Sequence, residues 1–269
     1  MRRPVLSNVT ASMPGEKRVT KGRAKLAMGQ GLSVWVLEVA DGFGDASLHS
    51  HHAIQITFCL QGTLKLANAR ERVSGPIIAV AADAVHRIEA EGLLAFVFVE
   101  PESRLGRDLT ERFFRDGELV AVDEPDLNTL VEPLRSTFDV ARDVSTLLDV
   151  GRAVAGRLAP GTAAAMPDPR VQRIMDYAAA HLDEPLSLTG AAHDVYLSPS
   201  RLRHLFVEQT GLAFRTYLLW LRLVRAVQLY SEGRSLTEAA HGAGFSDSAH
   251  FSRVFRRTFG LPATTLTRI

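Results

Sequence analysis

Hydrophobic residues follow two different periodicities along this chain of 269 residues. Between residues 32 and 100 they form short runs rich in β-branched and aromatic side chains, and Gly, Asp and Asn separate these runs. Such runs are typical of β-strands, and several without intervening helices favour a small sandwich or barrel. Residues 1–30 are expected to be partly disordered or to add a strand. The predicted strands are 32–39, 54–60, 63–67, 77–80 and 93–99.

The apolar pattern changes to the helical repeat between Arg104 and Leu158. Two apolar stripes on these helices must be buried, because a stripe of this kind is unstable in water. Packing onto the β region and packing onto another subunit both remain open. The first stripe comprises Leu127, Leu130, Val131, Leu134 and Phe138, and the second comprises Val144, Leu147, Leu148 and Val154.

Proline, glycine and small residues dominate the next stretch, APGTAAAMPDP. This composition predicts a linker and therefore a domain boundary. The chain then divides into a β region at 1–103, a helical segment at 104–158, a linker at 159–168 and a helical domain at 169–269.

The helical domain begins with a helix that Asp168 is expected to cap. Residues 186–211 then predict a short helix, a tight turn at Val195–Leu197 and a longer helix. Ser198 is the expected N-cap of the longer helix, and Gly211 is expected to end it. This order is that of a helix-turn-helix unit.

The same plan returns at residues 235–260, offset by about 48 residues. A short helix leads to a turn at Gly244–Phe245, and a longer helix then runs to Phe259 and ends at Gly260. A helix at 214–230 joins the two units and would span roughly 25 Å. With its neighbours it could hold two recognition helices about one DNA turn apart, on the order of 34 Å.

Reading DNA requires particular side chains on such helices. Arg, Ser and His near the start of a recognition helix can bond to base edges, and other arginines hold phosphates. From residue 168 onward the chain has 12 Arg, no Lys and 9 Asp or Glu, a net charge of +3 that alone would not indicate a nucleic-acid partner. Many of these arginines nevertheless fall on a few helix faces. The polar candidates are Ser200, Arg201, Arg203 and His204 in the first unit, Ser248, His250, Ser252, Arg253 and Arg256 in the second, and Arg222 and Arg225 between them.

The segments LSPSRLRHLF and GFSDSAHFSRVFRRTFG resemble the DNA-binding domain of AraC/XylS-type regulators, a resemblance that covers about a hundred residues. It implies that double-stranded DNA and RNA polymerase are partners, that residues 104–158 form a homodimer interface, and that the protein is an activator. The sequence departs from the family at Tyr196, where glycine is common, and also at Ala239, Ala263 and Leu266. The implied base-facing residues are Ser200, Arg203 and His204, then Ser248, Ala249, His250 and Ser252, with Arg253 near DNA.

Histidines gather in the β region at His49, His51 and His86. The spacing from His49 and His51 to Gln55 and Gly62 resembles the first cupin motif, with Gln in place of the usual Glu. His86 keeps its place in a second, degraded motif. Strand alternation would place His49 and His51 on one face, as a chelating pair needs. The resemblance implies a cupin-like barrel in which these four side chains converge.

Four interpretations of this cluster remain open. Imidazole suits Zn, Ni, Cu or Fe, so a divalent transition metal could help to bind an effector. The others are a metal-free polar effector pocket, a vestigial pocket and a metal-dependent enzyme, and no cofactor is assigned. His52 is expected to face the opposite side, where its ring nitrogens are either exposed to solvent or hydrogen-bonded within the protein. Cys59 is the only cysteine, which excludes an internal disulfide, and we expect a buried structural thiol.

These patterns together predict an α+β chain with a cupin-like barrel, flanking helices and an all-α domain that carries two helix-turn-helix units. The predicted function is a cytoplasmic, sequence-specific transcription regulator that responds to a small-molecule effector in the barrel and is not an enzyme. No apolar run is long enough for a membrane partner to be expected. The rivals are a cupin enzyme with a helical appendage and an interaction module whose C-terminal helices bind protein.

Overall fold

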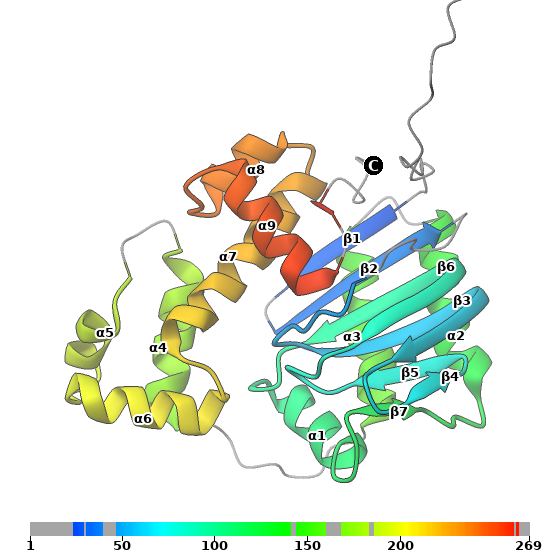
Figure 1. Cartoon of the computed structure of the whole chain (residues 1–269), viewed down its shortest axis with the longest axis horizontal. Helices are drawn as coiled ribbons and strands as arrows, with labels where there is room; N and C mark the ends of the chain where they lie inside the picture. The colour runs from blue at the N-terminus through cyan, green and yellow to red at the C-terminus, as the bar shows by residue number, and fades with distance from the viewer. Residues whose placement is uncertain are drawn as a thin grey trace, which may run out of the picture.

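The computed structural model describes residues 24–29, 31–39, 47–140, 144–159, 168–182, 186–260 and 262–263. Most of the predicted linker, the first 23 residues and Leu266 lie outside these ranges. Within them the chain forms a sheet with helices behind it, followed by a helical domain that lies beside the sheet (Figure 1).

The N-terminal domain is built on one antiparallel sheet of seven strands. Its path runs β1-β2-β6-β3-β5-β7, with β4 paired to β3. The predicted all-β region is therefore confirmed, but the pairings of the described strands form an open path and do not close the predicted barrel. The strands are β1 (Ala24–Gly29), β2 (Leu32–Val39), β3 (Ile54–Ala67), β4 (Arg72–Ser74), β5 (Ile77–Val80), β6 (Arg87–Val99) and β7 (Leu119–Ala121).

The two strands predicted at 54–60 and 63–67 are one long strand, β3, that pairs along its length with β6. Gly62 faces Gly92 across this pair, and their φ angles are 105° and 104°. A Cβ atom on Gly62 would lie 2.0 Å from the carbonyl oxygen of Glu91, so glycine is required there. The glycine that suggested a strand end instead allows a bend beside the irregular register at Cys59.

Helices α1 (Arg104–Phe113), α2 (Leu127–Val140) and α3 (Val144–Leu158) follow in chain order. Figure 1 shows α2 and α3 behind the sheet, and their apolar stripes share a core with its residues. The stripes are therefore buried within the chain, which answers the question that the sequence left open. A dimer through residues 104–158 stays a prediction and would need another face of these helices. The stripe residues in this core include Leu130, Val131, Leu134, Phe138, Leu147 and Val154.

The C-terminal domain contains the predicted helices. Asp168 and Ser198 cap α4 and α6 by accepting the N–H groups of Arg170 and Arg201. Gly211 and Gly260 end α6 and α9 with φ angles of 71° and 70°. No helix in the described ranges has the length and apolarity needed to cross a membrane. The helices are α4 (Pro169–Ala180), α5 (Leu188–Asp194), α6 (Pro199–Thr210), α7 (Phe214–Ser231), α8 (Leu236–Gly242) and α9 (Ser248–Phe259).

The sheet face opposite α2 and α3 packs against the C-terminal domain, with α9 lying in front of β1 and β2 (Figure 1). Trp35 of β2 stacks on Phe255 of α9 with ring centroids 6.4 Å apart. The Phe259 ring lies 4.8 Å from Trp35 and 5.7 Å from Phe98 of β6. One hydrophobic core therefore continues from the inner face of the sheet into the second helix-turn-helix unit.

Candidate DNA-reading helices and effector site

Helix α6 presents the side chains that are predicted to read the first half of a DNA site. Leu202 and Phe206 anchor the helix in the core. The Ser198 hydroxyl accepts the Arg201 N–H at 3.3 Å, which fixes the start of the helix. All four predicted residues of this unit are exposed, namely Ser200, Arg201, Arg203 and His204.

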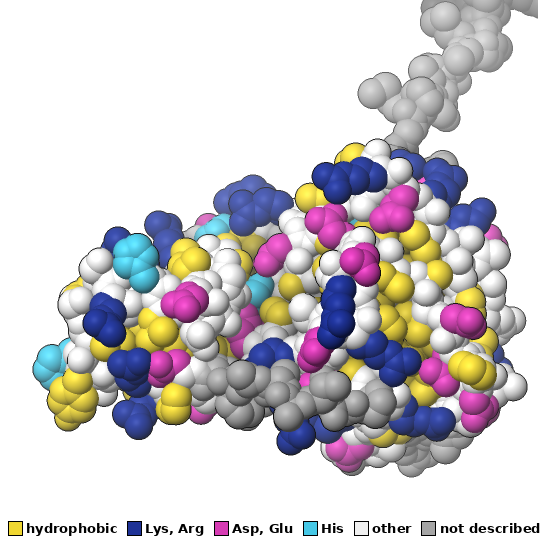
Figure 2. Space-filling model, turned by 90° about the horizontal axis from the view of Figure 1, so that it is seen from below, with side chains coloured by type: hydrophobic (Ala, Val, Ile, Leu, Met, Phe, Trp, Pro, Cys, Tyr) yellow, Lys and Arg dark blue, Asp and Glu magenta, His cyan; other side chains and the backbone are white. Residues whose placement is uncertain are grey.

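Helix α9 is anchored in the same way in the second unit. Its aromatic face is buried, and the Asp247 carboxylate accepts the His250 N–H at 2.6 Å at the start of the helix. Figure 2 shows Lys and Arg side chains spread over the surface formed by the C-terminal helices. Among the predicted residues Ala249, Arg253 and Arg256 are exposed, and Ser248, His250 and Ser252 are half-buried.

The two arginines of α7 lie in different surroundings from the recognition residues. Arg222 is half-buried, and a Cβ atom on Gly244 would lie 3.0 Å from its Nε. Arg225 is exposed and donates to Gln228 at 3.0 Å. Arg225 also lines a cleft of about 1040 Å³ between the domains, which Glu100 lines as well. Both arginines are thus close to other parts of the protein, and their phosphate role stays a prediction.

The histidines predicted from the cupin-like spacing do converge. His49 and His86 exchange two backbone hydrogen bonds of 2.9 Å, which brings their ring centroids to 4.3 Å. The His51 ring lies 5.1 Å from that of His86, and one ring nitrogen from each of the three lies within 4.8 Å of the others. Gln55 lies next to them, with its Oε1 2.9 Å from His51 Nε2.

Burial keeps these imidazoles neutral. It lowers the pKa of His51 to about 4 and the pKa of His86 to about 2, and it also lowers the pKa of His49. His86 Nε2 is buried without a hydrogen-bond partner, so it is available to a ligand. A neutral His51 has one N–H and can donate to only one of the two oxygens beside its ring, the Ala53 carbonyl oxygen and Gln55 Oε1. The donor set suits a metal or a polar effector alike.

The C-terminal end of α9 covers this cluster. The Phe259 ring lies 6.1 Å from the His51 ring, and the Ser47 hydroxyl donates to the Gly260 carbonyl at 3.5 Å. A Cβ atom on Gly260 would lie only 2.5 Å from His49 Nδ1. No sequence signal pointed to this contact, because Phe259 and Gly260 also fit the internal pattern of a helix and its cap.

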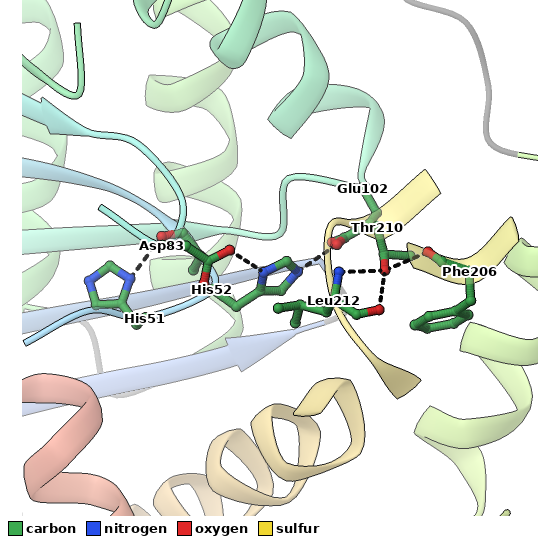
Figure 3. A network of polar contacts seen from close by, with 8 residues as sticks. His51, His52, Asp83, Glu102, Phe206, Thr210 and Leu212 are labelled. Atoms are coloured by element: carbon green, nitrogen blue, oxygen red, sulfur yellow. Dashed lines mark hydrogen bonds and ion pairs between the residues drawn. The ribbon is translucent and has the colours of Figure 1, made fainter. Parts of the chain in front are cut away.

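His52 was predicted to face away from the cluster as a solvated or satisfied side chain, and the structure shows a buried, fully bonded one. Its Nε2 lies 2.5 Å from Glu102 and its Nδ1 lies 3.4 Å from Asp83 (Figure 3). Burial alone would lower the pKa of His52, but the two carboxylates outweigh burial and raise it to about 9. His52 is therefore a buried cation at neutral pH.

The His52 group links the two candidate regions (Figure 3). On one side the Asp83 N–H donates to the His51 carbonyl at 2.8 Å. On the other side Glu102 and Thr210, the last residue of α6, line the same small cleft. Thr210 donates to Phe206 at 2.8 Å and accepts the Leu212 N–H at 3.2 Å, which fixes the connection from α6 to α7.

Comparisons with known protein sequences found similarity in the C-terminal domain. A family model described as a helix-turn-helix domain matches residues 191–269. The regulator GbdR of Pseudomonas aeruginosa is 37% identical over 95 residues, 35% of this chain and 26% of that protein. The arabinose operon regulatory protein of Escherichia coli is 36% identical over 95 residues, 35% of this chain and 32% of that protein.

The activator RhaS of Salmonella schwarzengrund is 36% identical over 93 residues, 34% of this chain and 34% of that protein. Residues 191–269 are therefore similar to a helix-turn-helix domain. The curated relatives named above are transcriptional regulators, and each is similar to only about a third of this chain. The chain spans only about a quarter to a third of the length of these relatives.

Solved structures extend the fold similarity to both domains. ToxT from Vibrio cholerae O395 matches with a TM-score of 0.53 at 13% identity, covering 88% of this chain and 98% of that one. A ToxT structure with bound unsaturated fatty acid matches with a TM-score of 0.52 at 14% identity, covering 86% of this chain and 92% of that one. The shared feature is the fold, an N-terminal sheet domain followed by a helix-turn-helix domain.

The contact between α9 and the histidines can be tested with two matched glycines. Gly211 and Gly260 both end helices at φ near +70°, so alanine strains both, at about 1 kcal/mol each. Only at Gly260 would the added Cβ clash with His49 and the Ser47 carbonyl, whereas nothing lies within 4 Å at Gly211. Gly260→Ala should therefore lower the free energy of unfolding by roughly 1–3 kcal/mol more than Gly211→Ala does. Equal losses in urea denaturation would contradict this docking.

The charged state of His52 predicts a pH dependence of stability. Its folded pKa of about 9 lies above the unfolded value of 6.5, so its contribution is complete below pH 6.5 and is lost as the pH rises through 9. The loss in the free energy of unfolding is on the order of 3 kcal/mol at most. Glu100, whose pKa desolvation raises to about 7, acts with the same sign but at lower pH. His52→Gln should flatten the decline between pH 7 and 9, and parallel curves for the two proteins would contradict the ion pair.

Proposed function

We propose that this chain is a sequence-specific transcription regulator that reads DNA with two helix-turn-helix units and binds a small-molecule effector in its N-terminal domain. One observation carries the proposal. Helices α6 and α9 each begin at an N-cap and expose a polar face, and helix α7 joins the two units that contain them. Matching of residues 191–269 to a helix-turn-helix family supports it. A regulator of this class acts in the cytosol.

Residues near the start of the two recognition helices, α6 and α9, would contact the bases. We assign the reading of guanine in the first half-site to Arg203 and the corresponding role in the second to Arg253, since both side chains are exposed. Ser200 and His204 assist in the first unit, while Arg201 and Arg256 suit phosphates. In the second unit the assisting residues are Ser248, Ala249, His250 and Ser252.

The joining helix sets the spacing of the two half-sites. Helix α7 has 18 residues, so its length is about 27 Å. With the flanking helices added, this length supports two recognition helices about one turn of B-DNA apart, on the order of 34 Å. The operator should therefore contain two elements within about 15–20 base pairs.

The histidine cluster is the effector site that we favour, with Gln55 as an additional polar group. Because Phe259 and Gly260 cover these histidines, an effector must displace the end of α9 to reach them. An effector that binds only the displaced state would shift the population toward it and so alter operator binding. The similarity of fold to a fatty-acid-bound ToxT supports a ligand in this domain without identifying its chemistry.

Whether a metal assists this effector can be answered by elemental analysis of the purified chain. One equivalent of a transition metal, lost in His86→Ala, would favour a metal-assisted site over a metal-free pocket. Stoichiometric iron together with turnover would instead favour the rival enzyme. Activation, contact with RNA polymerase and a homodimer stay predictions that rest on the resemblance alone.

The proposal as a whole is tested by selecting genomic DNA fragments with the purified chain in moderate salt and sequencing those retained. The expected result is one recurring site with two elements a helical turn apart. No enrichment over bulk DNA, with effector candidates present and absent, would contradict sequence-specific reading and leave the protein-interaction rival.

Substitutions in the two recognition helices should affect different halves of that site. Arg203→Ala should relax the preference at one base pair of one element, at a cost of about 1–3 kcal/mol in binding, because a bidentate contact is lost. Arg253→Ala should act on the other element. Arg70→Ala removes the same charge from an exposed position on the sheet domain and is the control. Equal losses on selected and scrambled DNA for Arg203→Ala would contradict its base-reading role.

A further inference from the structure

Tyr196 lies in the turn of the first helix-turn-helix unit and has an unfavourable backbone conformation. Its φ angle is 55°, and Asp83 is the only other described non-glycine residue with a positive φ. A Cβ atom in this region approaches the following carbonyl oxygen, so a large side chain there lowers stability. Asp tolerates this conformation better than Tyr does, because its short polar side chain can bond locally.

The second unit has a glycine, which adopts a positive φ angle without strain, at the same position. Leu188 aligns with Leu236 and Ser198 with Ser246, which aligns Tyr196 with Gly244. Gly244 has a φ angle of 80°, and a Cβ atom there would also press on Arg222 Nε at 3.0 Å. The chain therefore uses glycine where this turn is packed, and uses tyrosine where the same turn is open.

Nothing in the described part of the chain compensates for the strain at Tyr196. Its side chain is 94% exposed, the largest value among the exposed large hydrophobic residues. No hydrogen bond of the hydroxyl and no ring contact is found among the described residues. An aromatic ring in water at a strained position does not favour folding, which points to a contact outside the described residues.

The position of the ring identifies that partner. Tyr196 lies two residues before Ser198, the N-cap of α6, and the first turn of α6 carries the exposed Arg201. The turn itself is fixed, because the Tyr196 N–H donates to His193 at 3.2 Å and the Leu197 N–H donates to Ala192 at 3.0 Å. A rigid turn next to the start of a recognition helix lies beside the DNA strand that the helix approaches.

We propose that Tyr196 binds the DNA backbone beside the first half-site, with its phenol hydroxyl donating to a phosphate oxygen. Tyrosine is a common phosphate donor, and such contacts fix the register without reading sequence. This inference rests on the proposed DNA-binding function. It adds a positioning residue at a place where the second unit has glycine and can make no such contact.

The test uses Tyr196→Gly and Tyr196→Phe in the full chain, with binding measured by fluorescence anisotropy on selected and on scrambled DNA. Tyr196→Gly should raise Tm by about 2–4 °C because strain is relieved. It should also weaken binding to both DNAs by about tenfold, since a phosphate contact is blind to sequence. Tyr196→Phe should weaken binding to both DNAs almost as much as Tyr196→Gly does, but it should not raise Tm. Tyr177→Phe, on α4, removes a hydroxyl from a half-exposed tyrosine of the same domain and should leave affinity unchanged.

The outcomes separate this inference from the function on which it rests. If the unaltered chain binds the selected site and Tyr196→Gly binds equally well, the Tyr196 contact is wrong and the DNA-binding function stands. If affinity is unchanged but transcription with RNA polymerase falls, the ring contacts protein, and the proposal is again overturned. If the unaltered chain selects no DNA, both the function and the Tyr196 contact fall.

Discussion

The aromatic end of α9 against the inner face of the sheet is the contact on which the arrangement of this protein depends. Phe255 and Phe259 meet Trp35 and Phe98 there, and the same contact closes over the histidines. The sheet has a second apolar face that α2 and α3 cover, and the residues of its inner face share a core with the C-terminal helices. Buried apolar area of this kind is the main favourable term in domain association. The second helix-turn-helix unit thus shares the core of the N-terminal domain.

This shared core gives the protein a physical route between its two sites. The end of α9 fills the space beside the histidine cluster, because even one added methyl on Gly260 would clash with His49. The ion pair of His52 and Glu102 lies next to the cluster and near the end of α6. The first unit is tied to the second by α7, so a change at either contact can alter how the two recognition helices are held.

The sequence allowed much of this fold to be predicted, because local signals determine it. The caps Asp168 and Ser198, the terminal glycines Gly211 and Gly260, and the 48-residue offset between the units placed the C-terminal helices nearly to the residue. The convergence of His49, His51 and His86 was expected from resemblance to a known motif, although none of the three lies within a strand.

Other features could not be read from the sequence, because they depend on which surfaces meet. Phe259 fits the apolar stripe of α9 whether it faces its own domain or the sheet. Gly62 signalled a strand end, but its role as a bend becomes visible only with Gly92 opposite it. The partner of His52, Glu102, lies fifty residues further along the chain. No periodic sequence pattern extends over such a separation, so the pair could not be predicted. Barrel closure was expected from resemblance and is absent from the pairings of the described strands.

The central claim, that the N-terminal domain and the second helix-turn-helix unit share one core, is tested most directly by calorimetric unfolding of the unaltered chain. A shared core couples the domains, so we expect a single heat-absorption peak whose calorimetric enthalpy equals its van't Hoff enthalpy. Two separate peaks, each with the enthalpy of one domain, would show that the domains unfold independently and would contradict the account.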